Sequence, residues 1–136
     1  MRPARRARIV VCMGGGKKLA GVRVLIVEDN FLIAEQLSRL VQDEGAEVVG
    51  PVATSQMACA LIRSRPLDGA LLDVSLQWEE STQIASLLEE RHVPFVVVTG
   101  HEREFISDRF PAAPYVSKPF SEKNLITLVS ETFVAA

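Results

Sequence analysis

The sequence predicts an α/β protein built on a five-stranded, doubly wound parallel sheet with helices on both faces. From Leu19 onward, short apolar runs rich in β-branched residues alternate with segments whose apolar residues recur at helical spacing. Continuous apolar runs of this kind are typical of parallel strands buried on both faces. Right-handed crossovers make the doubly wound sheet the most economical arrangement of such repeats. A chain of 136 residues has room for one domain with a proper core.

The predicted strands are short and mostly apolar, and they cover residues 22–28, 46–50, 69–73, 93–98 and 113–117. Gly50 and Pro51 are expected to close the second strand, because this pair favours a turn. The other four strands each end at or just before a polar residue.

The predicted helices cover residues from Asn30 to near Gly45, then 55–64, 81–91, a weak segment near 102–109, and the residues after Ser121. Asn30, Thr54 or Ser55, and Ser121 are the predicted N-caps. The segment 102–109 has a narrow apolar face, so we expect a short and mobile helix there.

Charge is distributed unevenly along the chain. Residues 1–18 hold six of the 15 basic residues and no acidic residue, and they include a glycine run typical of a linker. We expect a disordered basic tail over 1–18 and one domain over 19–136. The domain carries a formal net charge of −8, which argues against direct DNA binding because phosphate contacts dominate that affinity.

No apolar stretch is long enough for a membrane span, and the apolar segment near the start is too short for the hydrophobic region of a signal peptide. Cys12 and Cys59 fit neither a disulfide framework nor a metal site, so we expect free thiols and a cytoplasmic protein.

Five polar residues follow the downstream ends of four predicted strands: Glu28, Asp29, Asp73, Thr99 and Lys118. In a parallel sheet the strand ends of one polarity lie along one edge, where ligands bind. We therefore expect these side chains to share one pocket. Three carboxylates, a hydroxyl and an ammonium suit a divalent cation together with a phosphoryl group.

The pocket predicts phosphoryl transfer to a carboxylate. Asp73 is the candidate nucleophile, since carboxylates can form aspartyl phosphates. Clustered carboxylates need a cation, and Mg²⁺ prefers such hard oxygen ligands. Lys118 and Thr99 would contact the phosphoryl oxygens, and Pro119 restricts the turn after Lys118. Taken alone, Glu28-Asp29 also fits helix-start chemistry, and Lys118-Pro119 also fits a plain turn.

Together these segments resemble the response-regulator receiver domain of two-component signalling, a flavodoxin-like fold. The resemblance covers roughly residues 19–136 and rests on Glu28-Asp29, Leu71-Leu72-Asp73-Val74, Val97-Val98-Thr99-Gly100 and Tyr115-Val116-Ser117-Lys118-Pro119-Phe120. It implies Asp73 as the phosphoacceptor, Glu28 and Asp29 as the acidic Mg²⁺ pair, and Lys118 as the phosphate-contacting lysine. It further implies Thr99 as the switch hydroxyl and the backbone carbonyl of Ser75 as a Mg²⁺ ligand.

A narrower likeness concerns Pro94-Phe95-Val96-Val97-Val98-Thr99-Gly100, which is similar to the Pro-Phe-x-Phe-Ala-Thr-Gly signature of some single-domain receivers. This likeness implies a stand-alone receiver whose partner is a histidine kinase of the HWE type. Val97 and Val98 replace the Phe and Ala of that signature, and His101 also departs from it. Tyr115 fits either a switch aromatic or an inward-packed strand residue.

The resulting prediction is a single-domain response regulator that accepts a phosphoryl group on Asp73 from a histidine kinase or phosphotransfer protein. It would signal to an unknown downstream protein by phosphorylation-dependent contact, or act as a phosphate sink. It is not expected to be an enzyme beyond its own phosphotransfer and slow dephosphorylation. The alternatives are a pseudo-receiver without chemistry and an aspartyl-phosphate hydrolase. Ser75 argues against the hydrolase, because such enzymes use an Asp two residues after the nucleophile as the general acid/base.

For three further residues we expect a structural role and no part in the chemistry of the pocket. We expect the Trp78 side chain to pack in the core or at an edge of the domain rather than to act at the pocket. His92 is expected at a solvated helix end, and His101 at the surface near the next helix.

Overall fold

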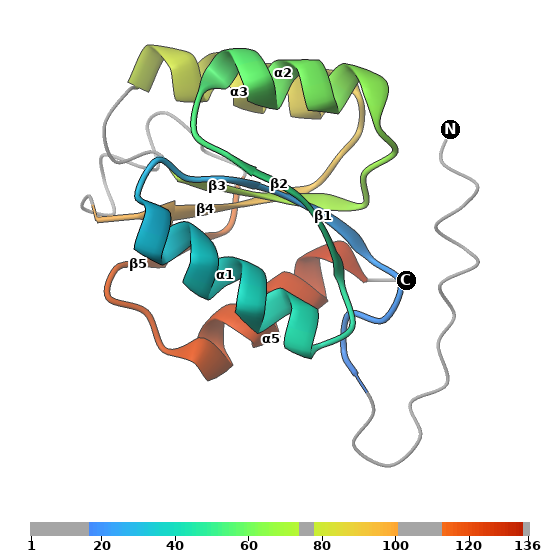
Figure 1. Ribbon diagram of the computed structural model, residues 1–136, viewed down its shortest axis with the longest axis vertical. Helices are drawn as coiled ribbons and strands as arrows, with labels where there is room; N and C mark the ends of the chain where they lie inside the picture. The colour runs from blue at the N-terminus through green and yellow to red at the C-terminus, as the bar shows by residue number, and fades with distance from the viewer. Residues whose placement is uncertain (1–16, 74–77, 101–112, 135–136) are drawn as a thin grey trace.

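The computed structural model describes residues 17–73, 78–100 and 113–134, and the side chains of residues 78–80 are outside that description. Its elements follow the chain as β1 (Arg23–Val27), α1 (Phe31–Asp43), β2 (Glu47–Val52), α2 (Ser55–Ser64), β3 (Gly69–Asp73), α3 (Trp78–Glu90), β4 (Phe95–Thr99), β5 (Tyr115–Ser117) and α5 (Glu122–Phe133). The five strands form one sheet in the order β2-β1-β3-β4-β5, and every neighbouring pair is parallel (Figure 1). The predicted fold class is confirmed. The helix predicted near 102–109 lies outside the described residues, as do Ser75 and His101.

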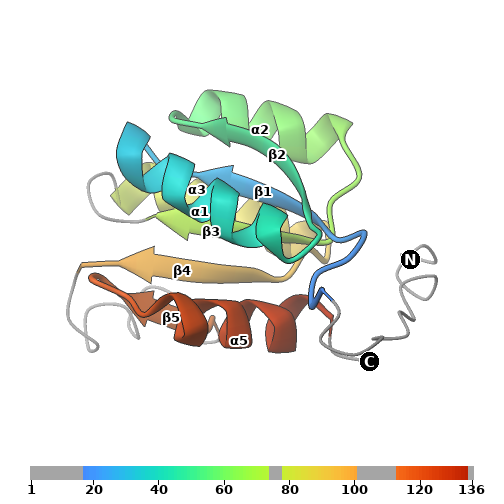
Figure 2. The ribbon, with the colours of Figure 1, turned by 60° about the horizontal axis from the view of Figure 1, so that its bottom comes forward.

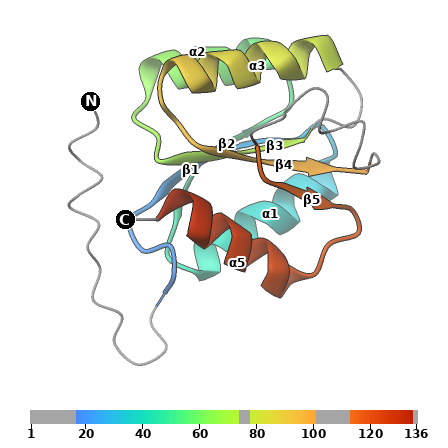
Figure 3. The same cartoon turned by 180° about the vertical axis from the view of Figure 1, so that it is seen from behind.

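Helices cover both faces of the sheet. α1 and α5 lie on one face and α2 and α3 on the other, as Figures 1 and 3 show from opposite sides. Two apolar cores result. Leu25, Leu72 and Val97 point toward α2 and α3, whereas Ile26, Leu71 and Val96 point toward α1 and α5. The alternation explains why these strands read as continuous apolar runs, since both faces of each strand are buried.

The strand register aligns the ends that carry the polar residues. Val27 of β1 lies beside Leu72 of β3, so Glu28 follows at the level of Asp73. Asp73 in turn lies beside Val98 of β4, and Thr99 lies beside Ser117 of β5. The arrowheads of the strands accordingly point to the same edge of the sheet (Figure 2).

The second strand continues past its predicted end. β2 runs through Gly50 and Pro51 to Val52 instead of closing at Gly50. β2 is an edge strand, where a proline that cannot donate a hydrogen bond is tolerated. Gly50 has a positive φ of 94°, a conformation that glycine adopts without steric cost. The extension matters for the site, because the carbonyl of Val52 accepts the Glu28 N–H at 2.9 Å.

The third helix begins at Trp78, three residues before the predicted start at Ser81. The prediction relied on apolar residues at helical spacing, such as the buried Ile84 and Leu88. These residues begin after the first turn, so they did not indicate the earlier start. The remaining ends of the described strands and helices differ from the predicted ones by at most two residues, as is usual for such boundaries.

The predicted caps are confirmed. The side chains of Asn30, Thr54 and Ser121 accept hydrogen bonds from the N–H groups of Ile33, Met57 and Asn124 at 3.1, 3.2 and 3.2 Å. Thr54, rather than Ser55, is the N-cap of α2. His92 is exposed just after α3, as expected, with a φ of 60°.

Lys17 and Lys18 contact the end of α1. The Lys17 Nζ donates to the Asp43 carbonyl at 2.8 Å, and the Lys18 N–H donates to the Glu44 side chain at 3.0 Å. Among the described helices, none is long and apolar enough to cross a bilayer.

Candidate functional site

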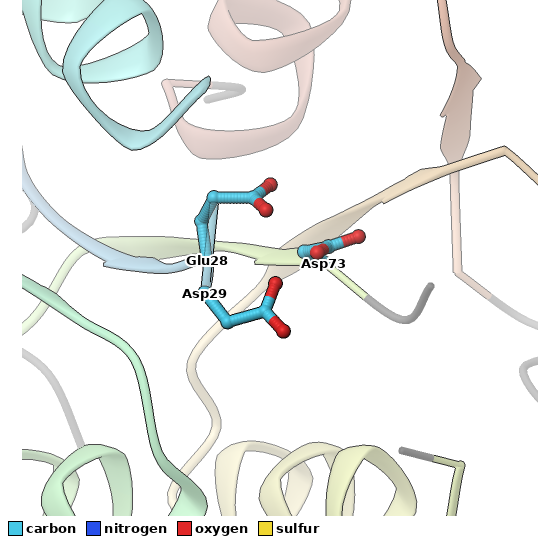
Figure 4. A group of neighbouring side chains, drawn as sticks. All are labelled: Glu28, Asp29 and Asp73. Atoms are coloured by element: carbon cyan, nitrogen blue, oxygen red, sulfur yellow. The ribbon is translucent and has the colours of Figure 1, made fainter. Parts of the chain in front are cut away.

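Three acidic side chains meet at the carboxyl edge of the sheet. Glu28 and Asp29 follow β1, and Asp73 ends β3. Each contributes a carboxylate oxygen, and these oxygens lie within 4.8 Å of one another. Figure 4 shows Glu28 and Asp29 extending from one strand end toward Asp73 on the neighbouring strand. The predicted convergence of the acidic residues is therefore present.

The three carboxylates differ in exposure. Glu28 is buried and Asp29 is exposed, while Asp73 is half-buried as a whole residue although its side chain is only 5% exposed. The cluster thus has one oxygen donor held inside the protein and one open to solvent. A ligand can therefore reach the site from solvent through Asp29, while the carboxylate of Glu28 stays shielded from water.

Lys118 provides the positive charge of the site. Its Nζ lies 3.2 Å from Asp73 Oδ1 and 3.4 Å from Glu28 Oε1, so one ammonium bridges two carboxylates. The side chains of Glu28, Asp73 and Lys118 have exposed fractions of 0%, 5% and 19%, so these contacts are largely shielded from solvent. Such shielding strengthens the attraction between charges.

The backbone holds Lys118 at this edge. Its N–H donates to the carbonyl of Thr99 at 2.6 Å, which extends the pairing of β4 and β5. The Lys118–Pro119 peptide bond is cis. Thr99 itself is fully buried at the end of β4. Of the predicted site residues, only Ser75 lies outside the described part of the chain.

Burial and charge repulsion act strongly on Glu28. The pKa of its carboxyl is raised from 4.5 to about 7, most of all by its removal from water and also by the hydrogen bond and negative charge of Asp73. The N–H of Asn30 and the charge of Lys118 oppose the shift without cancelling it. Burial is thus the main reason that the Glu28 carboxyl holds its proton more tightly than usual.

The residues present fit a bound magnesium ion. Mg²⁺ takes hard oxygen ligands and commonly binds through one or two carboxylates together with phosphate oxygens and waters. Three carboxylates meet around the ammonium of Lys118, and a divalent cation would offset the remaining negative charge. Both the donor atoms and the electrostatics therefore suit this ion.

Sequence reasoning missed the backbone contacts that hold Glu28. The N–H of Asn30 donates to Glu28 Oε2 at 3.1 Å, and the carbonyl of Val52 accepts the Glu28 N–H. Asn30 carried a signal as an N-cap, but nothing local indicated that it also contacts a site carboxylate. Val52 carried none, because its role depends on the pairing of two strands.

The comparisons with known proteins agree with this architecture. The family model of the response regulator receiver domain matches residues 24–130. The chain therefore belongs to the receiver domains of response regulators, the family of two-component signalling that its site motifs resemble.

Individual relatives support the same assignment. The transcriptional regulatory protein PdtaR of Mycobacterium tuberculosis is 32% identical over 111 residues, which cover 79% of this chain and 54% of PdtaR. The phyllosphere-induced regulator PhyR of Methylorubrum extorquens is 28% identical over 123 residues, covering 85% of this chain and 46% of PhyR. This chain thus spans about half the length of each of these two curated relatives.

A solved structure of similar size also matches. The solution structure of the BeF3-activated conformation of SdrG from Pseudomonas melonis Fr1 has a TM-score of 0.69 and 32% sequence identity to this chain. The match covers 86% of this chain and 97% of SdrG. The likeness therefore extends over nearly the whole of that structure.

Proposed function

We propose that this receiver accepts a phosphoryl group on Asp73, in a magnesium-dependent reaction, from the phosphohistidine of a histidine kinase or phosphotransfer protein. The observation that carries the proposal is the ammonium of Lys118 at 3.2 Å from Asp73, within a cluster of three carboxylates. A nucleophilic carboxylate, a fixed cationic side chain and a divalent-cation site are the parts that phosphoryl transfer to an aspartate needs.

In this reaction an oxygen of Asp73 attacks phosphorus, an O–P bond forms, and the P–N bond of the phosphohistidine breaks. The donor imidazole leaves with the bonding electron pair and takes a proton from water. Lys118 stabilises the negative charge on the phosphoryl oxygens, and the hydroxyl of Thr99 donates to one of them. Glu28, Asp29, Asp73 and the backbone carbonyl of Ser75 would hold the magnesium ion. When bound, the ion would supply positive charge that offsets the negative charge on the phosphoryl oxygens.

The product is an aspartyl phosphate that water slowly hydrolyses, so the protein does not turn over a free substrate. Phosphorylation would shift a two-state surface that a downstream protein reads, or the protein would drain phosphate from a relay. We place the reaction in the cytoplasm, the compartment in which a free cysteine such as Cys59 stays reduced.

Exposed apolar residues support a protein as the phosphodonor. Phe31 and Leu32 begin α1 directly after Asp29 and Asn30, with exposed fractions of 76% and 72%. Exposed apolar side chains beside a polar site suit contact with another protein better than contact with a small phosphate ester. The likeness of the segment from Pro94 to Gly100 to one receiver subgroup supports a donor kinase of the HWE type.

Labelling with acetyl phosphate tests the proposal. The wild type with Mg²⁺ is expected to gain one phosphoryl group by intact-mass spectrometry, and no group when EDTA removes the ion beforehand. Asp73→Asn should gain none, because the amide is not a nucleophile. The matched control Asp43→Asn removes an exposed carboxylate at the end of α1 and should label normally.

Other outcomes select the alternatives. Labelling of Asp73→Asn at another residue rejects Asp73 as the acceptor. No labelling of the wild type, together with no response to beryllofluoride, selects the pseudo-receiver. Rapid release of phosphate from many esters selects the hydrolase.

A further inference from the structure

We infer that Asn30 is a positioning residue of the magnesium site, which couples the start of α1 to the orientation of the Glu28 carboxylate. The inference rests on the proposed function, because it concerns the same metal site. Asn30 is not itself a proposed ligand, and none of the chemistry assigned above requires its side chain.

Two hydrogen bonds meet at Asn30. Its side-chain oxygen accepts from the N–H of Ile33 at 3.1 Å, which fixes the first turn of α1. Its own N–H donates to Glu28 Oε2 at 3.1 Å. The same residue therefore caps a helix with its side chain and holds a site carboxylate with its backbone.

The two oxygens of Glu28 have different partners. Oε2 accepts from Asn30, while Oε1 faces the Lys118 ammonium at 3.4 Å. With both oxygens held and the side chain fully buried, the carboxylate has one defined orientation toward Asp73 and Asp29. Groups that orient a metal ligand from behind contribute roughly 10- to 100-fold to metal affinity.

The side chain of Asn30 acts on that orientation through its own backbone. Asn30 has extended backbone angles, with φ −86° and ψ 115°, and its cap hydrogen bond helps to hold them. If the cap is removed, the backbone at Asn30 gains freedom, and its N–H no longer stays aimed at Glu28. The predicted consequence is weaker magnesium binding, caused by a residue that does not touch the ion.

The chain contains a matched control for this effect. Thr54 caps α2 through the same hydrogen-bond pattern, from its side chain to the N–H of Met57 at 3.2 Å. The first turn of α2 carries none of the proposed site residues. Thr54→Ala therefore removes a comparable cap without releasing a metal ligand, and it separates lost stability from lost ligand orientation.

The test measures the Mg²⁺ dissociation constant of the full chain by isothermal titration calorimetry with MgCl₂. Asn30→Ala is expected to weaken Mg²⁺ binding roughly 10-fold. Asn30→Ser should restore most of the affinity, because serine is also a good N-cap. Thr54→Ala should bind Mg²⁺ within about twofold of the wild type, a margin we set well below the effect expected at Asn30. Asn30→Gly, a milder N-cap replacement, provides a second cap-deleted variant should Asn30→Ala fold poorly.

A second readout does not depend on the metal. In EDTA, the amide proton of residue 30 should exchange with solvent several-fold faster in Asn30→Ala than in the wild type, because its acceptor is no longer held in place. Faster exchange together with weaker Mg²⁺ binding supports the inference.

The outcomes separate this inference from the proposed function. If the wild type binds Mg²⁺ and Asn30→Ala and Asn30→Gly bind it equally well, the inference is wrong and the metal site stands. Equal weakening in Thr54→Ala also overturns it, since the effect would then be one of general stability. If the wild type binds no Mg²⁺, the metal site of the proposed function fails and the inference fails with it.

Discussion

At the scale of single residues, the site is a balance between burial and charge. Glu28 is fully buried at its side chain, lies beside Asp73, and shares the ammonium of Lys118 with it. The pKa of Glu28 is raised to about 7, mainly by removal from water. A structure that retains a carboxyl group under these conditions gives up stability at this point, and a bound cation would recover it.

The raised pKa of Glu28 predicts an unusual pH dependence of stability for the metal-free protein. The folded state binds this proton more tightly than the unfolded state, whose carboxyl has a pKa near 4.5. The stabilising contribution is therefore complete below pH 4.5 and is lost as the pH rises through 7. The loss is on the order of 3 kcal/mol at most, because a tenfold difference in proton affinity between the two states corresponds to about 1.4 kcal/mol.

Urea unfolding in EDTA at several pH values measures this dependence. Glu28→Gln should flatten the curve between about pH 5 and about pH 8, since it removes the titrating group. Saturating Mg²⁺ should offset the loss in the wild type, because the ion favours the charged carboxylate. A wild-type curve that rises with pH over this range, with no difference from Glu28→Gln, would contradict the assignment.

At the scale of elements, single residues at the helix ends determine where the helices begin and end. Three side-chain caps begin α1, α2 and α5, and each is a residue type that favours that position. The end of α3 is different. His92 follows this helix with a φ of 60°, and its N–H donates to the carbonyl of Glu89 at 3.1 Å. A side chain with a Cβ is unfavourable in this left-handed conformation, where glycine is preferred.

The conformation of His92 predicts that His92→Gly stabilises the protein. Relief of the Cβ clash should add about 1 kcal/mol to the free energy of unfolding, less a part lost to the flexibility of the unfolded chain. The matched control is Arg91→Gly at the preceding exposed position, which has no positive φ and should lose stability. Urea unfolding checks both variants. A lower midpoint for His92→Gly would show that the histidine side chain contributes more than its backbone strain costs.

At the scale of the whole molecule, the sheet brings distant segments to one edge and leaves an apolar surface beside it. Lys118 is 45 residues from Asp73 and 90 residues from Glu28 along the chain. Phe31 and Leu32 lie at the start of α1, next to the acidic residues that they follow. A protein donor that approaches Asp73 from this edge would contact both side chains.

The exposed pair predicts a difference between two kinds of phosphodonor. Phe31→Ser together with Leu32→Ser should slow transfer from a phosphorylated histidine kinase by roughly 10-fold or more, because hot-spot apolar contacts each contribute at least about 1 kcal/mol. Labelling by acetyl phosphate should change little, since that donor makes no such contact. Met57→Ser, at an exposed apolar residue in the first turn of α2, serves as the comparison.

Rate constants for both donors, measured side by side, decide this prediction. Equal slowing with both donors would mean that the substitutions disturb the site itself. Unchanged transfer from the kinase would mean that the partner docks elsewhere on the receiver.

Much of the fold, and the convergence of the charged residues at one edge of the sheet, could be predicted from the sequence. The alternation of apolar runs and helical periodicity determined the parallel sheet, because strands buried on both faces need apolar residues at every position. The polar residues at the strand ends predicted a shared edge, where the structure brings Glu28, Asp29, Asp73 and Lys118 together and buries Thr99 at the end of β4. Errors arose where the local pattern was incomplete, as at Pro51, whose place inside β2 depends on β2 being an edge strand.

The chain by itself therefore determined which residues reach the carboxyl edge, since that follows from local patterns and the polarity of a parallel sheet. Only the tertiary structure decided how they meet there. The bridge from Lys118 to both Glu28 and Asp73, the hold of Asn30 on Glu28, and the raised pKa of Glu28 depend on distances between different elements. Burial and Coulomb interaction change steeply over a few ångströms, and a linear sequence does not specify separations that small.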